Sequence, residues 1–178
     1  SISNQSLEEE ITKHNDPVLV KALEWSKAVN HGIETELVGE DKPFEGVKRA
    51  LEEISKVAQI AIVSSANSEA VNSEWKRHGL MPFVSEFFGQ ERGSKAAAIK
   101  EIKSLGFEKE KILMIGDAPG DLDAAKVNEV HFYPILFGKE KESWETLIAK
   151  ILPEFIGGHY DDKKYQAIYH NHLSQFKS

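Results

Sequence analysis

Two patterns of apolar and polar residues follow one another along the chain. Up to residue 42 the apolar residues recur at helical spacing, and the stretch VLVKALEWSKAVNHG (18–32) predicts an amphipathic helix that stops at a glycine. From Pro43 onward, helical patterns alternate with short runs in which nearly every residue is apolar. The pattern therefore predicts a helical segment over residues 1–42 and a mixed α/β domain over residues 43–178.

The apolar runs of the second part are its predicted strands: AQIAIVS (58–64), FVSEFFG (83–89), KILMIG (111–116) and VHFYPIL (130–136). Predicted helices lie around them, at residues 43–54, 68–78, 94–105, 119–128, 141–152 and from residue 161 onward. Apolar strands separated by helices are typical of a parallel sheet that is covered on both faces. Ligands of such sheets bind beyond the carboxyl ends of the strands, which is where candidate site residues are expected.

Acidic residues follow the predicted strand at 111–116. Asp117 comes directly after Gly116, and Asp121 lies four residues later, in the first turn of the next predicted helix. Two carboxylates that converge at a strand end suit a hard divalent cation, and Mg2+ commonly takes one or two carboxylates together with water and phosphate oxygens. Asp123 falls elsewhere on the helix and is predicted to be a solvated surface acid. The alternative is that Asp117 and Asp121 only cap the helix.

Two other positions carry groups that suit an anion. Ser64 ends the strand at 58–64 and Ser65 follows it, and a hydroxyl beside the backbone N–H groups of a helix N-terminus favours an anion. Lys95 lies in the first turn of the next helix, where a cation opposes the helix dipole, and a phosphate with a nearby carboxylate would explain its position. The alternatives are a serine that caps a helix and an ordinary surface lysine.

The order of these groups along the chain is similar to that of a known family. A strand ending at Ser64, a helix starting near Lys95 and the stretch GDAPGD (116–121) resemble motifs two, three and four of the haloacid dehalogenase superfamily of phosphohydrolases. The resemblance covers about residues 43–137, and the helical segment before it resembles the last part of the family's inserted cap. It implies a Rossmann-like three-layer α/β sandwich with a parallel sheet and a partial helical cap.

The resemblance also implies a role for each residue. Ser64, with Ser65 beside it, would hydrogen-bond the transferring phosphoryl group, and Lys95 would balance the charge of the phosphate and of an aspartate nucleophile. Asp117 would coordinate Mg2+, and Asp121 would support the metal directly or through water. The implied activity is that of a Mg2+-dependent phosphohydrolase acting on a small phosphate ester.

The family's first motif has no counterpart in this sequence. That motif is an apolar strand followed by Asp-x-Asp, which carries the nucleophile, and it forms the central strand between those ending at Ser64 and Gly116. No aspartate of the chain fits this pattern. Either the chain is part of a longer polypeptide, which the sequence favours, or another segment fills the gap. The chain by itself is expected to be inactive. The alternative functions are a non-catalytic module that binds phosphate or metal, and a structural or partner-binding protein.

Composition narrows the classes of protein to which the chain can belong. A formal net charge of -7 argues against a general nucleic-acid binder, and the lack of cysteine excludes disulfides and thiolate metal sites. There is no apolar stretch long enough to span a membrane and no secretory signal pattern, so a cytoplasmic protein without membrane contact is predicted. The apolar positions of the C-terminal helix are predicted to cover the sheet, with a homodimer contact as the alternative.

Overall fold

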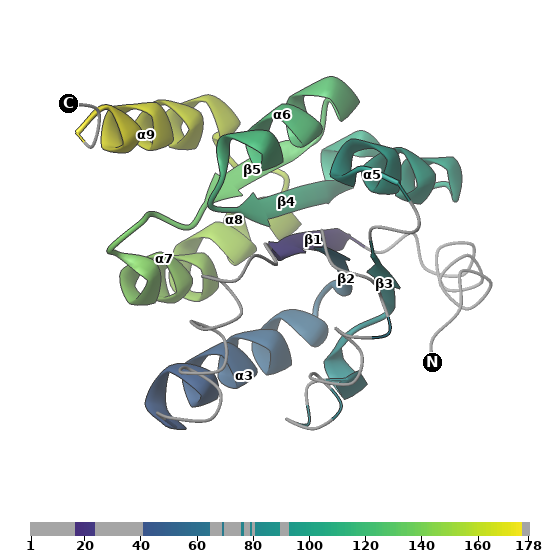
Figure 1. Ribbon diagram of the computed structural model, residues 1–178, viewed down its shortest axis with the longest axis horizontal. Helices are drawn as coiled ribbons and strands as arrows, with labels where there is room; N and C mark the ends of the chain where they lie inside the picture. Colours follow the sequence, from purple (N-terminus) through teal and green to yellow (C-terminus); the bar gives the residue numbers. More distant parts are fainter. Residues whose placement is uncertain are drawn as a thin grey trace.

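A five-stranded parallel sheet lies at the centre of the computed structural model, which describes residues 17–23, 41–64, 69, 76, 79, 81–89 and 93–175. Its strands are β1 (Val18–Leu23), β2 (Gln59–Ser64), β3 (Glu86–Phe88), β4 (Ile112–Gly116) and β5 (His131–Pro134). They lie in the order β3-β2-β1-β4-β5 (Figure 1). Every neighbouring pair is parallel, so the carboxyl ends of all strands lie along one edge of the sheet.

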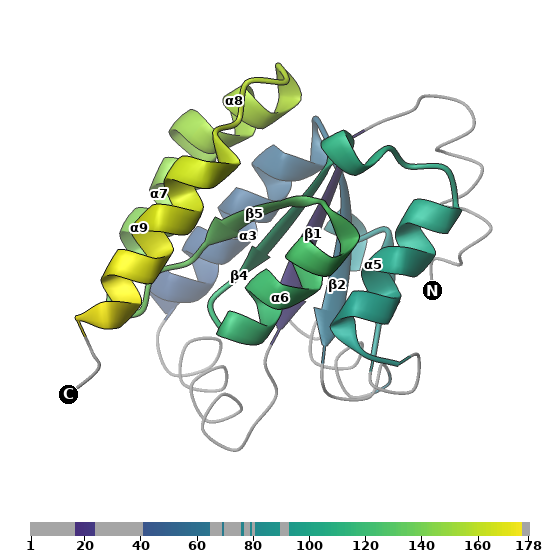
Figure 2. The same ribbon diagram turned by 90° about the horizontal axis from the view of Figure 1, so that it is seen from above.

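Helices cover both faces of this sheet. On one face lie α3 (Asp41–Ser55), α7 (Glu140–Thr146) and α8 (Leu152–Ile156), and on the other α5 (Lys95–Ser104) and α6 (Pro119–Asn128) (Figures 1 and 2). The C-terminal helix α9 (Asp162–Ser174) packs along the edge strand β5. Short helical turns complete the chain, η2 (Met81–Phe83), η4 (Lys109–Lys111) and the π-helical η5 (Leu147–Ile151). This is the predicted three-layer α/β fold.

The two faces of the sheet contribute to two separate apolar layers. Leu19 of β1 belongs to the layer that packs under α3, α7 and α8, whereas its neighbours Val18 and Val20 belong to the layer under α5 and α6. This follows from the geometry of a strand, in which successive side chains point to opposite faces. Because both faces are covered, most residues of each strand are apolar, which is why β2–β5 are visible in the sequence as short apolar runs.

The central strand differs from the prediction. Residues 18–23, predicted as the start of a helix in a cap segment, form β1, which pairs with β2 over Val18–Leu23 and with β4 over Val18–Lys21. A short apolar run is compatible with a helix or a buried strand, and here valine-rich residues that pair with strands on both sides form the strand. Residues 1–16 and 24–40 lie outside the described residues, so the rest of the helical segment and its boundary at residue 42 stay predictions.

The other predicted elements agree well with the structure. Predicted strands and helices from residue 43 onward coincide with β2–β5 and with α3, α5, α6 and α9 to within a few residues. The predicted helix at 141–152 is divided into α7, a π-helical turn and the start of α8. The predicted helix at 68–78 lies mostly outside the described residues. Tyr165 and Tyr169 of α9 are buried, so this helix does cover the sheet, and a homodimer contact stays a prediction.

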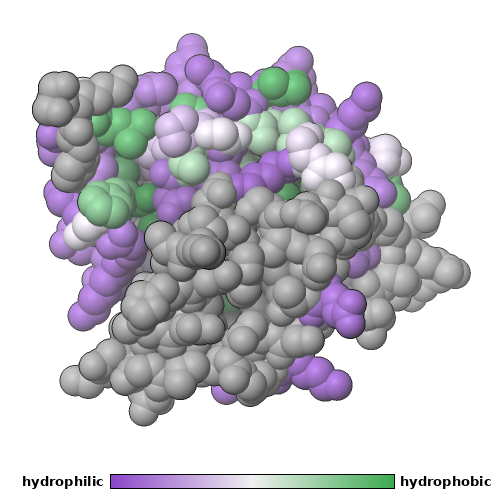
Figure 3. Space-filling view, viewed as in Figure 1, coloured by the Kyte–Doolittle hydropathy of each residue, from purple (hydrophilic) through white to green (hydrophobic). Residues whose placement is uncertain are grey.

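The described surface carries few apolar residues in any one place. Figure 3 shows apolar side chains in small groups among hydrophilic ones on the described part of one face. Large exposed apolar residues are spread over several elements, namely Val57, Val127, Phe137, Ile156 and Ile168. Among the helices that the structure describes, none has the length and apolar character needed to cross a membrane.

Candidate functional site

The turn from β4 to α6 is built around the buried side chain of Asp121. Its Oδ2 atom accepts hydrogen bonds from the backbone N–H groups of Asp117 and Ala118, both at 3.1 Å, and the side chain is fully buried. Gly116 lies directly against it, and a Cβ atom at this position would come within 2.7 Å of the Asp121 carboxyl carbon. Asp121 therefore acts as an internal cap of the turn, with glycine required beneath it.

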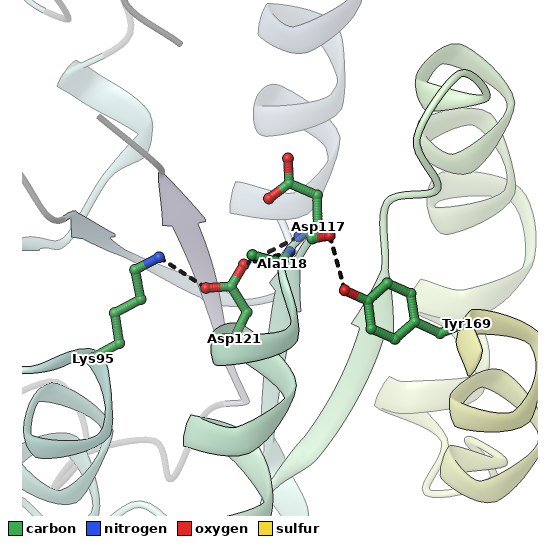
Figure 4. Close-up of polar contacts among 5 residues, drawn as sticks. All are labelled: Lys95, Asp117, Ala118, Asp121 and Tyr169. Carbon is green, nitrogen blue, oxygen red and sulfur yellow. Dashed lines mark hydrogen bonds and ion pairs between the residues drawn. The ribbon is translucent and has the colours of Figure 1, made fainter. Parts of the chain in front are cut away.

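Lys95 approaches the same carboxylate from the neighbouring helix. Its Nζ atom lies 2.8 Å from Asp121 Oδ1, and its side chain is 16% exposed (Figure 4). Lys95 is the first residue of α5, which begins beside the start of α6 at the carboxyl edge of the sheet. The ion pair explains why a lysine occupies a position that is unfavourable for a cation at the start of a helix.

Asp117 differs from Asp121 in its surroundings. Its side chain is exposed and points away from the Asp121 carboxylate, whereas its backbone N–H group is held by that carboxylate (Figure 4). The spacing of four residues thus brings the backbone of one aspartate to the side chain of the other, instead of joining two carboxylates. Asp123 is exposed, as predicted, on the helix that follows.

Ser64 ends β2 on the other side of the central strand. It is buried, with 4% of its surface exposed, and pairs with Leu23 of β1. Because β1 separates β2 from β4, Ser64 lies about two strand spacings, or about 10 Å, from the end of β4. Ser65 lies outside the described residues. The structure therefore brings Lys95, Asp117 and Asp121 together and places Ser64 at the same edge of the sheet.

Tyr169 of α9 also contacts this turn. Its hydroxyl group donates a hydrogen bond of 2.9 Å to the backbone carbonyl of Asp117, and its side chain is buried (Figure 4). Burial, followed by the negative charges of Asp121, Asp117 and Asp123, raises the pKa of the phenol to about 12, so the hydroxyl keeps its proton at neutral pH. Helical spacing predicts that Tyr169 is buried, but no pattern in the sequence links it to a turn 52 residues away.

The described groups determine what kind of metal ion they could hold. Within the described part of the chain, no group of three or more histidine or acidic side chains is arranged to bind a metal. Asp121 already accepts three hydrogen bonds, which leaves Asp117 as the exposed carboxylate of the turn. One carboxylate fits a cation such as Mg2+, which completes its coordination with water and phosphate oxygens, but not a cage made only of protein ligands.

The position of the family's first motif is occupied in this fold. β1 lies between β2 and β4, so the favoured prediction that this strand is missing from the chain is wrong, and the alternative that another segment fills the gap is confirmed. The sequence after β1 continues with Glu24, Trp25 and Ser26 and contains no Asp-x-Asp. The strand is thus present in its place, without the aspartates that the resemblance associates with it.

The chain is similar to several solved structures of haloacid dehalogenase-like hydrolases. One from Geobacter sulfurreducens, of subfamily IA, is 17% identical, with a TM-score of 0.46, and the match covers 51% of this chain and 49% of that one. One from Streptococcus pneumoniae is 13% identical, with a TM-score of 0.50 over 67% of this chain and 84% of that one. One from Ehrlichia chaffeensis is 14% identical, with a TM-score of 0.47 over 67% and 87%. The chain thus spans about half the length of the Geobacter protein.

A family model also matches the chain. The model of the haloacid dehalogenase-like hydrolases matches residues 2–135, which include the segment before Pro43, the central strand and the turn that holds Asp117 and Asp121. No curated protein matches the chain. The pneumococcal structure supports the same fold. Since the family model matches well over half of the 178 residues, the chain belongs to the haloacid dehalogenase-like hydrolase family.

Proposed function

We propose that this chain provides the phosphate- and Mg2+-binding part of a phosphohydrolase that acts on a small phosphate ester. One observation carries the proposal. The Lys95 ammonium pairs at 2.8 Å with the buried Asp121 carboxylate, at the same turn that exposes Asp117. With the Ser64 hydroxyl at the same sheet edge, these groups suit a phosphate dianion and its metal ion.

Each residue has a separate task in this proposal. Asp117 is the protein ligand of Mg2+, and water and phosphate oxygens supply the other ligands. Asp121 supports the metal indirectly, because its oxygens hold the turn and Lys95. Lys95 contributes positive charge toward the phosphate, and Ser64 with Ser65 donates hydrogen bonds to it. When bound, the metal would neutralise negative charge on the phosphoryl group.

The covalent mechanism that the resemblance implies needs an aspartate nucleophile in an Asp-x-Asp motif after the central strand, and the sequence after β1 contains no such motif. We therefore expect residues 1–178 to bind a phosphate ester and Mg2+ without turnover, and the hydrolytic activity to depend on a nucleophile that these residues do not provide. The same observation favours a second candidate function, that of a phosphate-binding module of this fold without catalysis.

The proposal is tested by the thermal stability of the wild-type chain and of Asp117→Asn in rising MgCl2 with inorganic phosphate at constant ionic strength. A ligand at ten times its dissociation constant stabilises the native state by about 1.4 kcal/mol, which raises the Tm of a chain of this size by about 3–6 °C. We expect this shift in the wild type and its loss in Asp117→Asn, because the variant lacks the charged ligand.

Asp123→Asn is the matched control, since it removes an exposed carboxylate from the same region of the chain. It should keep the Mg2+ response of the wild type. An equal response in Asp117→Asn would contradict the assignment of the metal ligand. A wild type that responds to neither Mg2+ nor phosphate would contradict the proposed function and favour a structural role. Release of phosphate from p-nitrophenyl phosphate by residues 1–178 would contradict the expectation that this chain binds without turnover.

A further inference from the structure

Asp117 is held through its backbone from two sides. The peptide group between Asp117 and Ala118 has its carbonyl oxygen bound by the Tyr169 hydroxyl at 2.9 Å and its N–H bound by Asp121 Oδ2 at 3.1 Å. The preceding peptide group donates its N–H to the same Asp121 oxygen. Since the orientation of these two peptide planes sets the φ and ψ angles of Asp117, the three contacts fix the direction in which its Cα–Cβ bond leaves the backbone.

We infer that Tyr169 is a positioning residue for Asp117, whose hydroxyl group aims the exposed carboxylate at a divalent cation bound together with phosphate. The inference rests on the proposed function of Asp117 as the metal ligand. Tyr169 does not touch the cation itself. It acts through the carbonyl of Asp117, from a helix that follows the rest of the fold in the sequence (Figure 4).

A second contact indicates that α9 supports more than one loop at this edge. One turn after Tyr169, the Nε2 atom of His172 lies 2.8 Å from the carbonyl oxygen of Phe137, in the loop that follows β5. Consecutive turns of one helix thus bind backbone carbonyls beyond the ends of β4 and β5. A helix that only covered the sheet would need no polar contacts with these loops. Apolar contacts would be enough, such as the packing of the Tyr169 ring against the Phe132 ring, with ring centroids 5.5 Å apart.

The chain contains a matched control for this hydroxyl group. Tyr160 is also buried and donates a hydrogen bond of 2.6 Å to a backbone carbonyl, that of Phe132 in the strand β5. Tyr160→Phe and Tyr169→Phe both remove one buried phenol and leave one carbonyl without its donor. Only Tyr169→Phe releases the Asp117 carbonyl. A general loss of stability is therefore expected in both variants, whereas weaker Mg2+ binding is expected only in Tyr169→Phe.

The wild type, Tyr169→Phe and Tyr160→Phe are titrated with MgCl2 in the presence of inorganic phosphate. The shift in Tm measures Mg2+ binding in each of them. We expect both variants to have a lower Tm than the wild type without metal. The Mg2+ dissociation constant should rise about tenfold in Tyr169→Phe and stay within about twofold of the wild type in Tyr160→Phe. An unchanged dissociation constant in Tyr169→Phe, with a normal wild-type response, would overturn this inference and leave the proposed function intact.

A wild type without any Mg2+ response would overturn the proposed function, and the inference with it. If Tyr169→Phe does not fold, 19F spectra of wild-type chain labelled with 3-fluorotyrosine give an independent test, with the Tyr169 signal assigned from variants of the other three tyrosines. The Tyr169 signal should shift on Mg2+ addition and saturate with the binding curve. A signal that does not move while Mg2+ binds would overturn the inference.

Discussion

Gly116 illustrates how one residue determines the geometry of the candidate site. Asp121 can turn back over the end of β4 and accept two backbone N–H groups because Gly116 has no side chain. The requirement comes from the close approach of the buried carboxylate, which occupies the space that a Cβ atom at Gly116 would need. Gly116 precedes the exposed Asp117 but is needed by a different aspartate, Asp121, which lies five residues after the glycine.

Gly116→Ala should destabilise the protein by about 1–3 kcal/mol, the usual cost of forcing an extra carbon into a packed site. Asp121 would have to move, and its hydrogen bonds to Asp117 and Ala118 would weaken. Chemical denaturation measures the change in the free energy of unfolding. Gly120→Ala is the control, because a Cβ atom there meets no other atom within 4 Å. In a helix this change should be neutral or stabilising by up to about 1 kcal/mol. Equal effects of the two substitutions would show that the close approach of Asp121 to Gly116 does not require a glycine there.

At the scale of elements, the Lys95–Asp121 ion pair joins the starts of two neighbouring helices. α5 and α6 each begin at the carboxyl edge of the sheet, and each has a positive dipole end there. Asp121 lies in the first turn of α6, where the dipole favours it, and its charge compensates the unfavourable position of Lys95 at the start of α5. The pair therefore fixes the relative position of two helices that follow different strands.

Lys95→Met should lower the free energy of unfolding by about 3 kcal/mol, since removal of one partner leaves a fully buried carboxylate without its counter-charge. Lys100→Met is the matched control on the same helix, at an exposed position, and should change stability by no more than about 0.5 kcal/mol. Urea denaturation of both variants checks the difference. If Lys95→Met proved as stable as Lys100→Met, the ion pair would not be what holds these helix starts together.

At the scale of the whole molecule, a cluster of tyrosines ties the C-terminal helix to the sheet. Tyr160 and Tyr165 stack with ring centroids 5.4 Å apart, and the Tyr165 ring packs edge-on against that of Tyr133 of β5, with centroids 5.7 Å apart. The hydroxyl groups of Tyr133 and Tyr160 donate to backbone carbonyls at 2.7 and 2.6 Å. Through this cluster α9 packs along β5, and its residue Tyr169 reaches the turn at Asp117. The candidate site therefore depends on residues near the end of the sequence.

Burial raises the pKa of Tyr160 well above its ordinary value of 10.0, and the nearby Asp162, Tyr133, Tyr165 and Glu154 raise it further. In the unfolded chain this phenol ionises near pH 10, whereas in the fold it stays protonated. The native state therefore binds more protons, and the free energy of unfolding should fall as the pH rises above about 10.

Tyr160→Phe removes this phenol and should make the loss of stability between about pH 10 and pH 12 less steep. Thermal unfolding of both chains over this range measures the slope. Wild-type stability that stays constant up to pH 12, or a variant with the same slope as the wild type, would contradict the assignment of the raised pKa to Tyr160.

Local patterns in the sequence were enough to predict the fold class and most elements after residue 43, and to name candidate site residues. These depend on local patterns: apolar runs for buried strands, helical spacing for helices, and polar residues at strand ends. Ser64, Lys95, Asp117 and Asp121 could be named because each one directly ends or follows such an element.

The tertiary structure was needed to find which strand is central and which groups the Asp121 carboxylate contacts. Residues 18–23 have an apolar pattern that suits a helix as well as a strand, and pairing with β2 and β4 determined the outcome. Whether Asp121 reaches a metal or the backbone depends on the space above Gly116 and on Lys95 from another helix. The contact of Tyr169 with Asp117 joins residues 52 positions apart, and such a contact leaves no local pattern, because the fold alone brings the two together.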